Sequence, residues 1–375
     1  MYLNMLSFIG KSKRKLTTGA LLLSTLLMLS ACGTNGSGAS AGGSAPAPDA
    51  GKSQAAAPAA SAPAQAPASA PKDVAPINVA YMPDMHGATP IVLGEEKGYF
   101  KEAGLKVNAV KFLSGPPEFQ AMASGDIDIA YIGPGATFLS AQGKGNIIAI
   151  DSLNTGDMVY ATKKSNIKDW KDLKGKTVGV PKGTSGEMIL NLGIEKGGLK
   201  PSDVNIVNMD VAGAVSAYVS GKVDAVAIWS PYTAEIEKQV GKDNIVKLGD
   251  NKTFFPEYVF PQSWVVNPKF LKEKPEVVER FLQAWAKAND YRMKNIDESI
   301  KLTAKFTQVP EDSLKAQVET TEWIDSKKQI DYFKDGTVFK WYENLEKLFV
   351  AGEKLTEVVP ADKFVSKDLY LKVIK

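Results

Sequence analysis

The chain of 375 residues contains a single cysteine, Cys32, and a single histidine, His86. One thiol cannot form an intramolecular disulfide, and one thiol with one imidazole cannot supply the Cys and His ligands of a zinc site. A Ser-His-Asp or Cys-His catalytic group would have to use His86. Gly175-Lys176-Thr177 ends like a phosphate-binding P-loop, but the first glycine of that motif would fall on Trp170. These scarcities leave catalysis little to work with, and we expect neither a metal nor a cofactor.

The chain also has little net charge once its N-terminus is set apart. The formal net charge of +3 includes four cations before Cys32 and no acidic residue there, so the remainder carries 3 − 4 = −1. The four cations are Lys11, Lys13, Arg14 and Lys15. Nucleic acid and anionic lipid are both recognised through basic surfaces. Neither is therefore expected to be a partner of the folded part.

The N-terminus has the pattern of an export signal. Its basic residues are followed by an apolar stretch from Leu16 to Leu29, which is too short for a comfortable membrane span. The stretch ends on Leu29-Ser30-Ala31-Cys32. This end resembles the lipobox of bacterial lipoproteins, in which the cysteine is diacylated and the chain is cut before it. We therefore predict a lipoprotein signal peptide over residues 1–31 and a lipid-anchored, extracytoplasmic protein at the bacterial cell membrane. The alternative is an ordinary signal peptide with an incidental cysteine.

The next segment is low in complexity. Residues 33–75 are almost entirely Gly, Ala, Ser and Pro. They carry too little apolar surface to offset the entropy of ordering a chain, and their Ala/Pro part is stiffer than their Gly/Ser part. We predict that the acylated Cys32 and the rest of residues 32–75 form a disordered tether between the membrane and a folded body.

The body alternates short β-rich runs with helical segments. The first β-rich runs are Ile77–Tyr81, Leu105–Phe112, Ile127–Ile132 and Ile147–Leu153. The alternation repeats between residues 167 and 240, and the chain after Pro268 is mostly helical. Such alternation is typical of parallel sheets covered by helices. We predict an α/β protein with two parallel-sheet units and a helical C-terminal segment that packs back onto the first.

Four β-rich runs are followed by small turns, rich in Gly, Ser or Pro, that open a helix. These turns are Asp84–Thr89, Ser114-Gly115-Pro116, Gly133-Pro134-Gly135 and Lys182–Gly186. In parallel sheets, ligands bind beyond the carboxyl ends of the strands, where helix N-termini present free N–H groups. Each helix end favours a negative group by about 0.3–1 kcal/mol. One such turn alone would be an ordinary helix start, but four of them together predict a site for a small anion.

Four segments of the body carry a family resemblance. They are residues 95–104 (EEKGYFKEAG), 124–132 (SGDIDIAYI), 172–185 (DLKGKTVGVPKGTS) and 220–232 (SGKVDAVAIWSPY). They resemble the periplasmic-binding-protein family of ABC importers, specifically its aliphatic sulfonate, taurine, nitrate and bicarbonate group. In order and spacing the resemblance covers essentially all of residues 77–375. It implies a type II periplasmic-binding-protein-like fold, with two lobes joined by two hinge crossings and a ligand cleft between them.

On this sequence the crossings would fall near Val159–Lys163 and Pro256–Val265. Lobe 1 would then comprise residues 76–162 and 257–375, and lobe 2 residues 163–256. The resemblance implies ligand contacts from both lobes. Lobe 1 would supply Asp84, His86, Gly87, Ser114, Gly115, Pro116, Gly133, Pro134 and Gly135. Lobe 2 would supply Lys182, Gly183, Thr184, Ser185, Gly186, Asp210, Trp229 and Tyr232.

Some of these residues have an ordinary structural alternative. Lys182 would be either the countercharge of an anion or a solvated lysine. Trp229 and Tyr232 would pack against the organic part of a ligand, or would belong to the core and the surface. His86 would contact the ligand or lie at the rim of the cleft. Relatives often have an acidic residue where Ser230 stands, so the resemblance implies no amine contact there.

The resemblance implies a monomeric solute-binding lipoprotein that catalyses no reaction. It would capture a small anion, such as an alkanesulfonate, taurine or nitrate, by hinge closure and deliver it to the permease subunits of an ABC importer. Three alternatives stay open. The first is a receptor of the same fold for a pyrimidine or an aromatic compound, and the second is a sensor subunit. The third is an enzyme of the thiamin-pyrimidine type, which an export signal and the lack of a cysteine-rich iron motif disfavour.

The lipid anchor can be tested at one residue. If Cys32 is acylated, Cys32→Ala is expected to move the protein from the membrane fraction to the soluble fraction, or to leave an uncleaved precursor. Cell fractionation with immunoblotting measures both. Unchanged membrane association together with normal cleavage would contradict the lipoprotein assignment.

Overall fold

The computed structural model describes residues 73–375. The predicted signal peptide, Cys32 and nearly all of the predicted tether lie outside the described residues. Between residues 73 and 375, no helix is both long and apolar enough to cross a bilayer.

A first sheet of six strands has the order β11-β4-β10-β3-β1-β2. Its strands are β1 (Ala75–Tyr81), β2 (Leu105–Lys111), β3 (Ile129–Ile132), β4 (Asn146–Asn154), β10 (Pro261–Val266) and β11 (Thr321–Trp323). Strand β1 pairs in parallel with β2 and β3. Strand β10 lies between β3 and β4 and is antiparallel to both, and β11 is antiparallel to β4.

A second sheet of five strands has the order β7-β6-β8-β5-β9. Its strands are β5 (Asp157–Thr162), β6 (Thr177–Val180), β7 (Asn205–Asn208), β8 (Ala225–Trp229) and β9 (Ile245–Asp250). Strand β6 pairs in parallel with β7 and β8. Strand β5 is antiparallel to both of its neighbours, β8 and β9.

The predicted α/β class is confirmed, but both sheets are mixed rather than wholly parallel. Successive strands joined by a helical crossover run parallel, as β1, β2 and β3 do. Strands β5 and β10 are reached from the other sheet instead, so no crossover sets their direction. Both pair antiparallel. The sequence pattern could not distinguish these cases, because a strand buried on both faces is apolar in either direction.

The chain passes between the sheets at two places. The first passage is Thr155-Gly156, between β4 and β5, and the second is the segment 251–260, between β9 and β10. The predicted crossing at Val159–Lys163 therefore falls mostly within β5, which is paired on both sides. Its residues alternate between two apolar clusters, with Val159 in one and Tyr160 in the other. The first half of the predicted crossing at Pro256–Val265, residues 256–260, lies in the second passage, and its second half, residues 261–265, belongs to β10.

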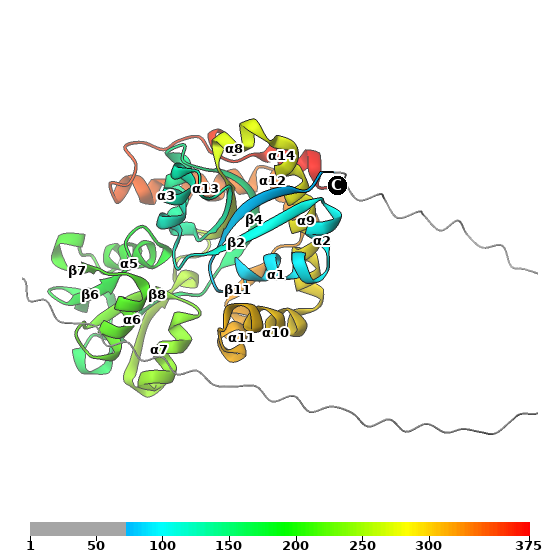
Figure 1. Ribbon diagram of the computed structural model, residues 1–375. Helices are drawn as coiled ribbons and strands as arrows, with labels where there is room; N and C mark the ends of the chain where they lie inside the picture. The colour runs from blue at the N-terminus through cyan, green and yellow to red at the C-terminus, as the bar shows by residue number, and fades with distance from the viewer. Residues whose placement is uncertain (1–72) are drawn as a thin grey trace, which may run out of the picture. The chain divides into compact units, whose positions relative to one another are not determined.

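Helices cover both sheets. Those that precede β10 are α1 (Ala88–Glu96), α2 (Tyr99–Glu102), α3 (Gly115–Ser124), α4 (Thr137–Ala141), α5 (Ser185–Lys196), α6 (Val211–Val219) and α7 (Tyr232–Val240). Those that follow are α8 (Pro268–Glu273), α9 (Pro275–Lys294), α10 (Ile296–Thr307), α11 (Glu311–Glu319), α12 (Ser326–Lys334), α13 (Thr337–Ala351) and α14 (Lys367–Val373). Figure 1 shows α5 and α6, in green, beside the second sheet, which they contact.

Helix α13 belongs to both cores. Val338 and Tyr342, in its first half, are buried in the cluster built on the first sheet. Leu345 and Phe349, further along, are buried in a cluster of the second sheet with Val178. The C-terminal segment was expected to pack on the first unit only. An amphipathic helix long enough to pass both sheets instead places its apolar face against each in turn.

Candidate functional site

A narrow cavity lies where residues of both sheets approach each other. It is lined by Met82, Asp84, His86, Ser114, Gly115, Tyr131, Gly133, Ala136, Asn154, Gly183, Thr184, Ser185, Trp229, Ser230, Gln262, Gln317, Thr320 and Thr321. The volume of the cavity is about 30 Å³. That is room for about two water molecules. A ligand of several atoms therefore requires the lining residues to move apart.

About half of the predicted site residues line this cavity. They are Asp84, His86, Ser114, Gly115, Gly133, Gly183, Thr184, Ser185 and Trp229. They come from strand-end turns of both sheets, because such turns share one edge of a sheet. Their contribution to binding stays a prediction.

The other predicted residues lie outside the cavity lining. Lys182 and Pro116 line a separate groove with Phe138. Asp210 caps α6, where its Oδ1 accepts the N–H of Gly213 at 2.6 Å. Tyr232 packs edge-on against Trp229, with 5.8 Å between ring centroids. The predicted countercharge Lys182 is therefore not a cavity residue.

Four further predicted residues serve the packing of the turns. Gly87 donates its N–H to Asp84 Oδ1 at 2.7 Å. A Cβ at Gly135 would lie 1.9 Å from the carbonyl carbon of Thr184, so only glycine permits this approach of the two turns. A Cβ at Gly186 would lie 2.6 Å from the carbonyl oxygen of Ala227. The carbonyl oxygen of Pro134 accepts the Thr137 hydroxyl at 2.7 Å.

The sequence reasoning missed several lining residues. They are Met82, Tyr131, Ala136, Asn154, Gln262, Gln317, Thr320 and Thr321. Tyr131, near the end of β3, and Asn154, at the end of β4, could have been found by extending the strand-end argument. Gln262, on β10, and Gln317, on α11, carried no such signal, because only the tertiary fold brings them to the cavity.

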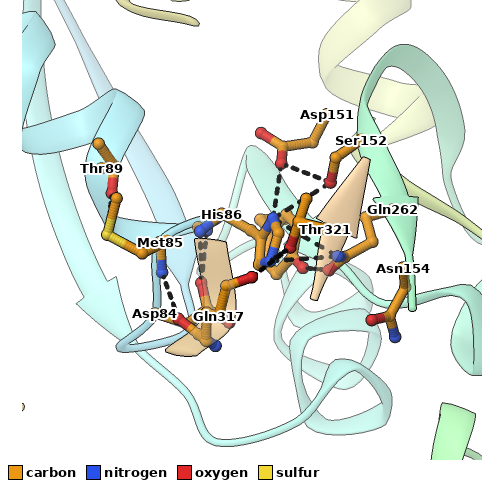
Figure 2. A network of polar contacts seen from close by, with 12 residues as sticks. Asp84, Met85, His86, Thr89, Asp151, Ser152, Asn154, Gln262, Gln317 and Thr321 are labelled. Carbon is orange, nitrogen blue, oxygen red and sulfur yellow. Dashed lines mark hydrogen bonds and ion pairs between the residues drawn. The ribbon is translucent and has the colours of Figure 1, made fainter. Parts of the chain in front are cut away.

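His86 is held in a polar network at one wall of the cavity. Its Nδ1 lies 2.9 Å from Asp151 Oδ2 and 3.1 Å from Ser152 Oγ. Its Nε2 lies 3.2 Å from Gln262 Nε2 and 3.3 Å from Thr321 Oγ1. Figure 2 shows the imidazole at the centre of these contacts. With 4 % exposure, His86 is a fixed wall residue rather than a mobile rim residue.

Arg292 neutralises Asp151 behind this wall. Arg292 Nη2 lies 3.0 Å from Asp151 Oδ1, and both side chains are fully buried. Burial alone would raise the pKa of Asp151, but the charges of Arg292 and His86 hold it below its ordinary value. The guanidinium group of Arg292 is thus already paired with the carboxylate of Asp151. Among the described residues that line the cavity, none is Lys or Arg.

Two helix N-termini end at the cavity, one from each sheet unit. Helix α3 begins behind Ser114 and α5 begins behind Thr184, and neither residue makes a side-chain capping hydrogen bond. The first N–H groups of a helix have no partner within the helix. Pro116 and Pro117 at the start of α3 have no N–H group, so α3 offers the Gly115 N–H and its dipole, whereas α5 has no proline in its first turn. Both helix ends favour an anion without a cationic side chain.

The hydroxyl of Ser185, expected as a ligand donor, is already used. Ser185 Oγ donates to Asp157 Oδ1 at 2.7 Å, and Asn251 Nδ2 donates to the other oxygen at 2.7 Å. Asp157 is fully buried. Burial raises its pKa, and the hydrogen bonds from Ser185 and Asn251 oppose that increase. Within residues 73–375, Ser114 lines the cavity with no hydrogen bond recorded for its hydroxyl, so it is the better donor for a ligand.

Asp84 is the one acidic residue in the described lining. Its Oδ1 accepts the N–H groups of His86 at 3.0 Å and Gly87 at 2.7 Å. Burial raises the pKa of Asp84 to about 6, against the opposing effects of the His86 charge and the two N–H groups, while Asp151 adds to the increase. At neutral pH the cavity therefore holds a carboxylate that is ionised at some cost.

Known proteins resemble this chain along most of its length. The NMT1/THI5-like family matches residues 86–299. A putative binding protein of Brucella abortus is 36% identical over 299 residues, which cover 80% of this chain and 91% of the relative. A putative aliphatic sulfonates-binding protein of Bacillus subtilis is 30% identical over 270 residues, 65% of this chain and 80% of the relative. The taurine-binding periplasmic protein of Escherichia coli is 28% identical, over 68% of this chain and 79% of the relative.

Solved structures share the fold. The alkanesulfonate-binding protein SsuA from Xanthomonas axonopodis pv. citri, bound to MOPS, superposes with a TM-score of 0.62 at 20% identity, covering 79% of this chain and 99% of that one. The desulfurization enzyme DSZB also superposes, with a TM-score of 0.56 at 16% identity, over 80% of this chain and 98% of that one. The fold therefore occurs in binding proteins and in an enzyme.

The fold, with its two sheet units, is that of the binding proteins that this chain resembles. The chain belongs to the NMT1/THI5-like family, and within it resembles the aliphatic sulfonate-binding and taurine-binding proteins. The family resemblance predicted from the sequence is thereby confirmed.

Asp84 yields a pH-dependent stability prediction. Its pKa is about 6 in the folded chain against an ordinary 3.8. Folding therefore loses stability as pH rises through this interval, at about 1.4 kcal/mol per pKa unit. Asp84→Asn keeps an oxygen for the His86 and Gly87 N–H groups and removes the charge. We expect it to raise the free energy of unfolding by on the order of 2–3 kcal/mol near neutral pH, and to have no such effect below about pH 4.

Denaturant unfolding over a pH series measures this difference between variant and parent. Asp210→Asn is the matched control, because Asp210 is exposed and its substitution is expected to give no comparable pH-dependent gain. An Asp84→Asn protein that is equally or less stable than the parent near neutral pH would contradict the argument.

Proposed function

We propose that the chain is an extracytoplasmic receptor that binds a small solute with an anionic group between its two sheet units and delivers it to an ABC permease. The observation that supports it best is the meeting of two uncapped helix N-termini, α3 and α5, at one cavity. Each end contributes about 0.3–1 kcal/mol toward a negative group, and up to about 2 kcal/mol where partly buried. No reaction is proposed.

The lining near Gly133 allows an anion to approach the backbone closely. Gly133 stands at the cavity with extended dihedral angles of φ −76° and ψ 164°. A Cβ there would have no neighbour nearer than Ser185 Oγ, at 4.0 Å. A ligand oxygen would accept hydrogen bonds from the free N–H groups at the start of α5 and from the Ser114 hydroxyl. The proposed site thus uses Ser114, Gly115, Gly133 and the Gly183–Ser185 turn, and not Lys182.

We further propose that the lobes follow the two sheets and that 155–156 and 251–260 are the hinge segments. Contacts across the cavity support a closed state. Gln317 and Ser230 both line the cavity, and Gln317 Nε2 donates to the carbonyl oxygen of Ser230 at 2.7 Å; away from the cavity, Lys354 Nζ lies 3.1 Å from Glu187 Oε2. Entry of a solute into so small a space requires these contacts to open. A ligand that bridges both helix ends would then favour the closed form by its differential affinity.

The anchor and the partners complete the proposal. The Leu29-Ser30-Ala31-Cys32 pattern supports a lipid-anchored monomer at a bacterial membrane, with permease subunits as its partners. A receptor for a pyrimidine or another aromatic compound is a second candidate. It is favoured by the rings of Tyr131, His86 and Trp229, which line the same cavity and could stack on a planar ligand.

Ligand-induced closure tests the receptor assignment. We expect a bound solute to reduce the radius of gyration in small-angle X-ray scattering and to raise the unfolding temperature by mass action. The panel is ethanesulfonate, taurine, nitrate, bicarbonate and pyrimidines. A change with a sulfonate supports the first candidate, and a change with a pyrimidine alone supports the second. A panel that moves neither quantity would contradict both.

Gly133→Val tests the location of the site. The substitution strains no backbone angle and directs a branched side chain into the cavity. We expect ligand affinity to fall at least about a hundredfold, which corresponds to about 2.7 kcal/mol, while the unfolding temperature without ligand changes little. Isothermal titration calorimetry measures the affinity, and Gly133→Ala, with a side chain of one carbon, should give a smaller loss. Parental affinity in the valine variant would place the ligand elsewhere.

A further inference from the structure

The acidic side chain of the cavity lining does more than cap a helix. Asp84 Oδ1 accepts both N–H groups of the turn that leads into α1. Capping needs a single acceptor oxygen, which Asn or Ser would supply without burying a charge. The turn therefore does not require a carboxylate, whose burial to 4 % exposure is costly.

The second oxygen of Asp84 has no donor in the described part of the protein. Each hydrogen bond recorded for this carboxylate ends on Oδ1. Asp84 lines the cavity, and Oδ2 is not among the atoms that are sealed from solvent. An ionised oxygen with little water and no protein donor favours a hydrogen-bond donor in the space that it faces.

The other acidic groups near Asp84 do not present an unpaired negative charge to the cavity. Asp151 is neutralised by Arg292. Glu118 is fully buried, and burial, with a smaller effect of Asp84, raises its pKa well above the ordinary value, which favours its neutral form. His86, the nearest basic group, is paired with Asp151 at 2.9 Å. The negative charge presented to a solute at neutral pH is therefore that of Asp84.

We propose that the solute is a zwitterion, whose anionic group lies at the N-termini of α3 and α5 and whose ammonium group pairs with Asp84. The inference rests on the proposed function, since it assigns the second end of the same site. A simple anion would bring its charge beside an ionised carboxylate in a space with little water, where like charges repel strongly. An ammonium group satisfies Asp84 Oδ2, which faces the same cavity.

Calorimetry with taurine, ethanesulfonate and ethylammonium tests the proposal. Taurine and ethanesulfonate share the sulfonate and differ in the amino group. At about pH 8, we expect the full chain to bind taurine at least about tenfold more tightly than ethanesulfonate. Ethylammonium, which lacks the anionic group, should bind weakly. Near pH 5, where Asp84 is largely protonated while both groups of taurine keep their charges, the preference should shrink.

Asp84→Asn should abolish most of the preference, because taurine loses its charge partner and binds more weakly while ethanesulfonate is no longer repelled and binds more tightly. Asp210→Asn is the control and should keep the preference. The pH comparison on the unsubstituted protein does not depend on the folding of either variant.

The outcomes separate the two proposals. Equal binding of taurine and ethanesulfonate, or a preference that survives in Asp84→Asn or at low pH, overturns the zwitterion and leaves the anion receptor standing. Binding of neither sulfonate overturns the zwitterion together with the sulfonate assignment.

Discussion

The buried ion pair of Asp151 and Arg292 holds together the wall on which the site is built. Arg292 comes from α9, and its Nη1 also donates to the carbonyl oxygen of Met85 at 2.7 Å. Asp151 comes from β4 and binds His86 in turn. The pair therefore joins the helical segment, a strand and the turn that carries Asp84. Removing one partner of such a buried pair typically costs about 3–5 kcal/mol, because the other charge stays buried. The orientation of His86 depends on this contact, because Asp151 binds both Arg292 and His86.

The charges at the cavity follow from the pairing of Arg292 with Asp151. Arg292 is already paired with Asp151, and the described cavity lining contains no Lys or Arg side chain. Attraction for a negative group falls instead to the starts of α3 and α5, whose N–H groups cost no side-chain entropy and no buried countercharge. Asp84 lies in the same lining with the opposite sign. In the proposed site, positive helix ends and one carboxylate would distinguish solutes by the placement of two charges, rather than by net charge alone.

Helix α13 constrains how the two sheet units move. Tyr342 belongs to the first core and Leu345 to the second, one turn apart on the same helix. If the two units separate at 155–156 and 251–260 as proposed, this helix must bend or slide against one of the cores. Packed helix faces resist continuous deformation, so discrete open and closed arrangements are favoured.

Local patterns of the sequence were sufficient for the elements and for part of the site. The chain after Pro268 is mostly helical, as its pattern predicts, and Ser114, Gly133 and Thr184 lie in the cavity because strand-end turns share one edge of a sheet. The tertiary structure alone decided what depends on partners distant in the chain. In the fold, β10 pairs antiparallel between β3 and β4, Lys182 lines another groove, and the Ser185 hydroxyl donates to Asp157. The fold also brings Gln262 and Gln317 to the cavity, and Arg292 to Asp151. Periodicity and turn chemistry report on neighbours within a few residues, whereas the direction of a strand and the partner of a buried charge are set by packing between segments far apart in the chain.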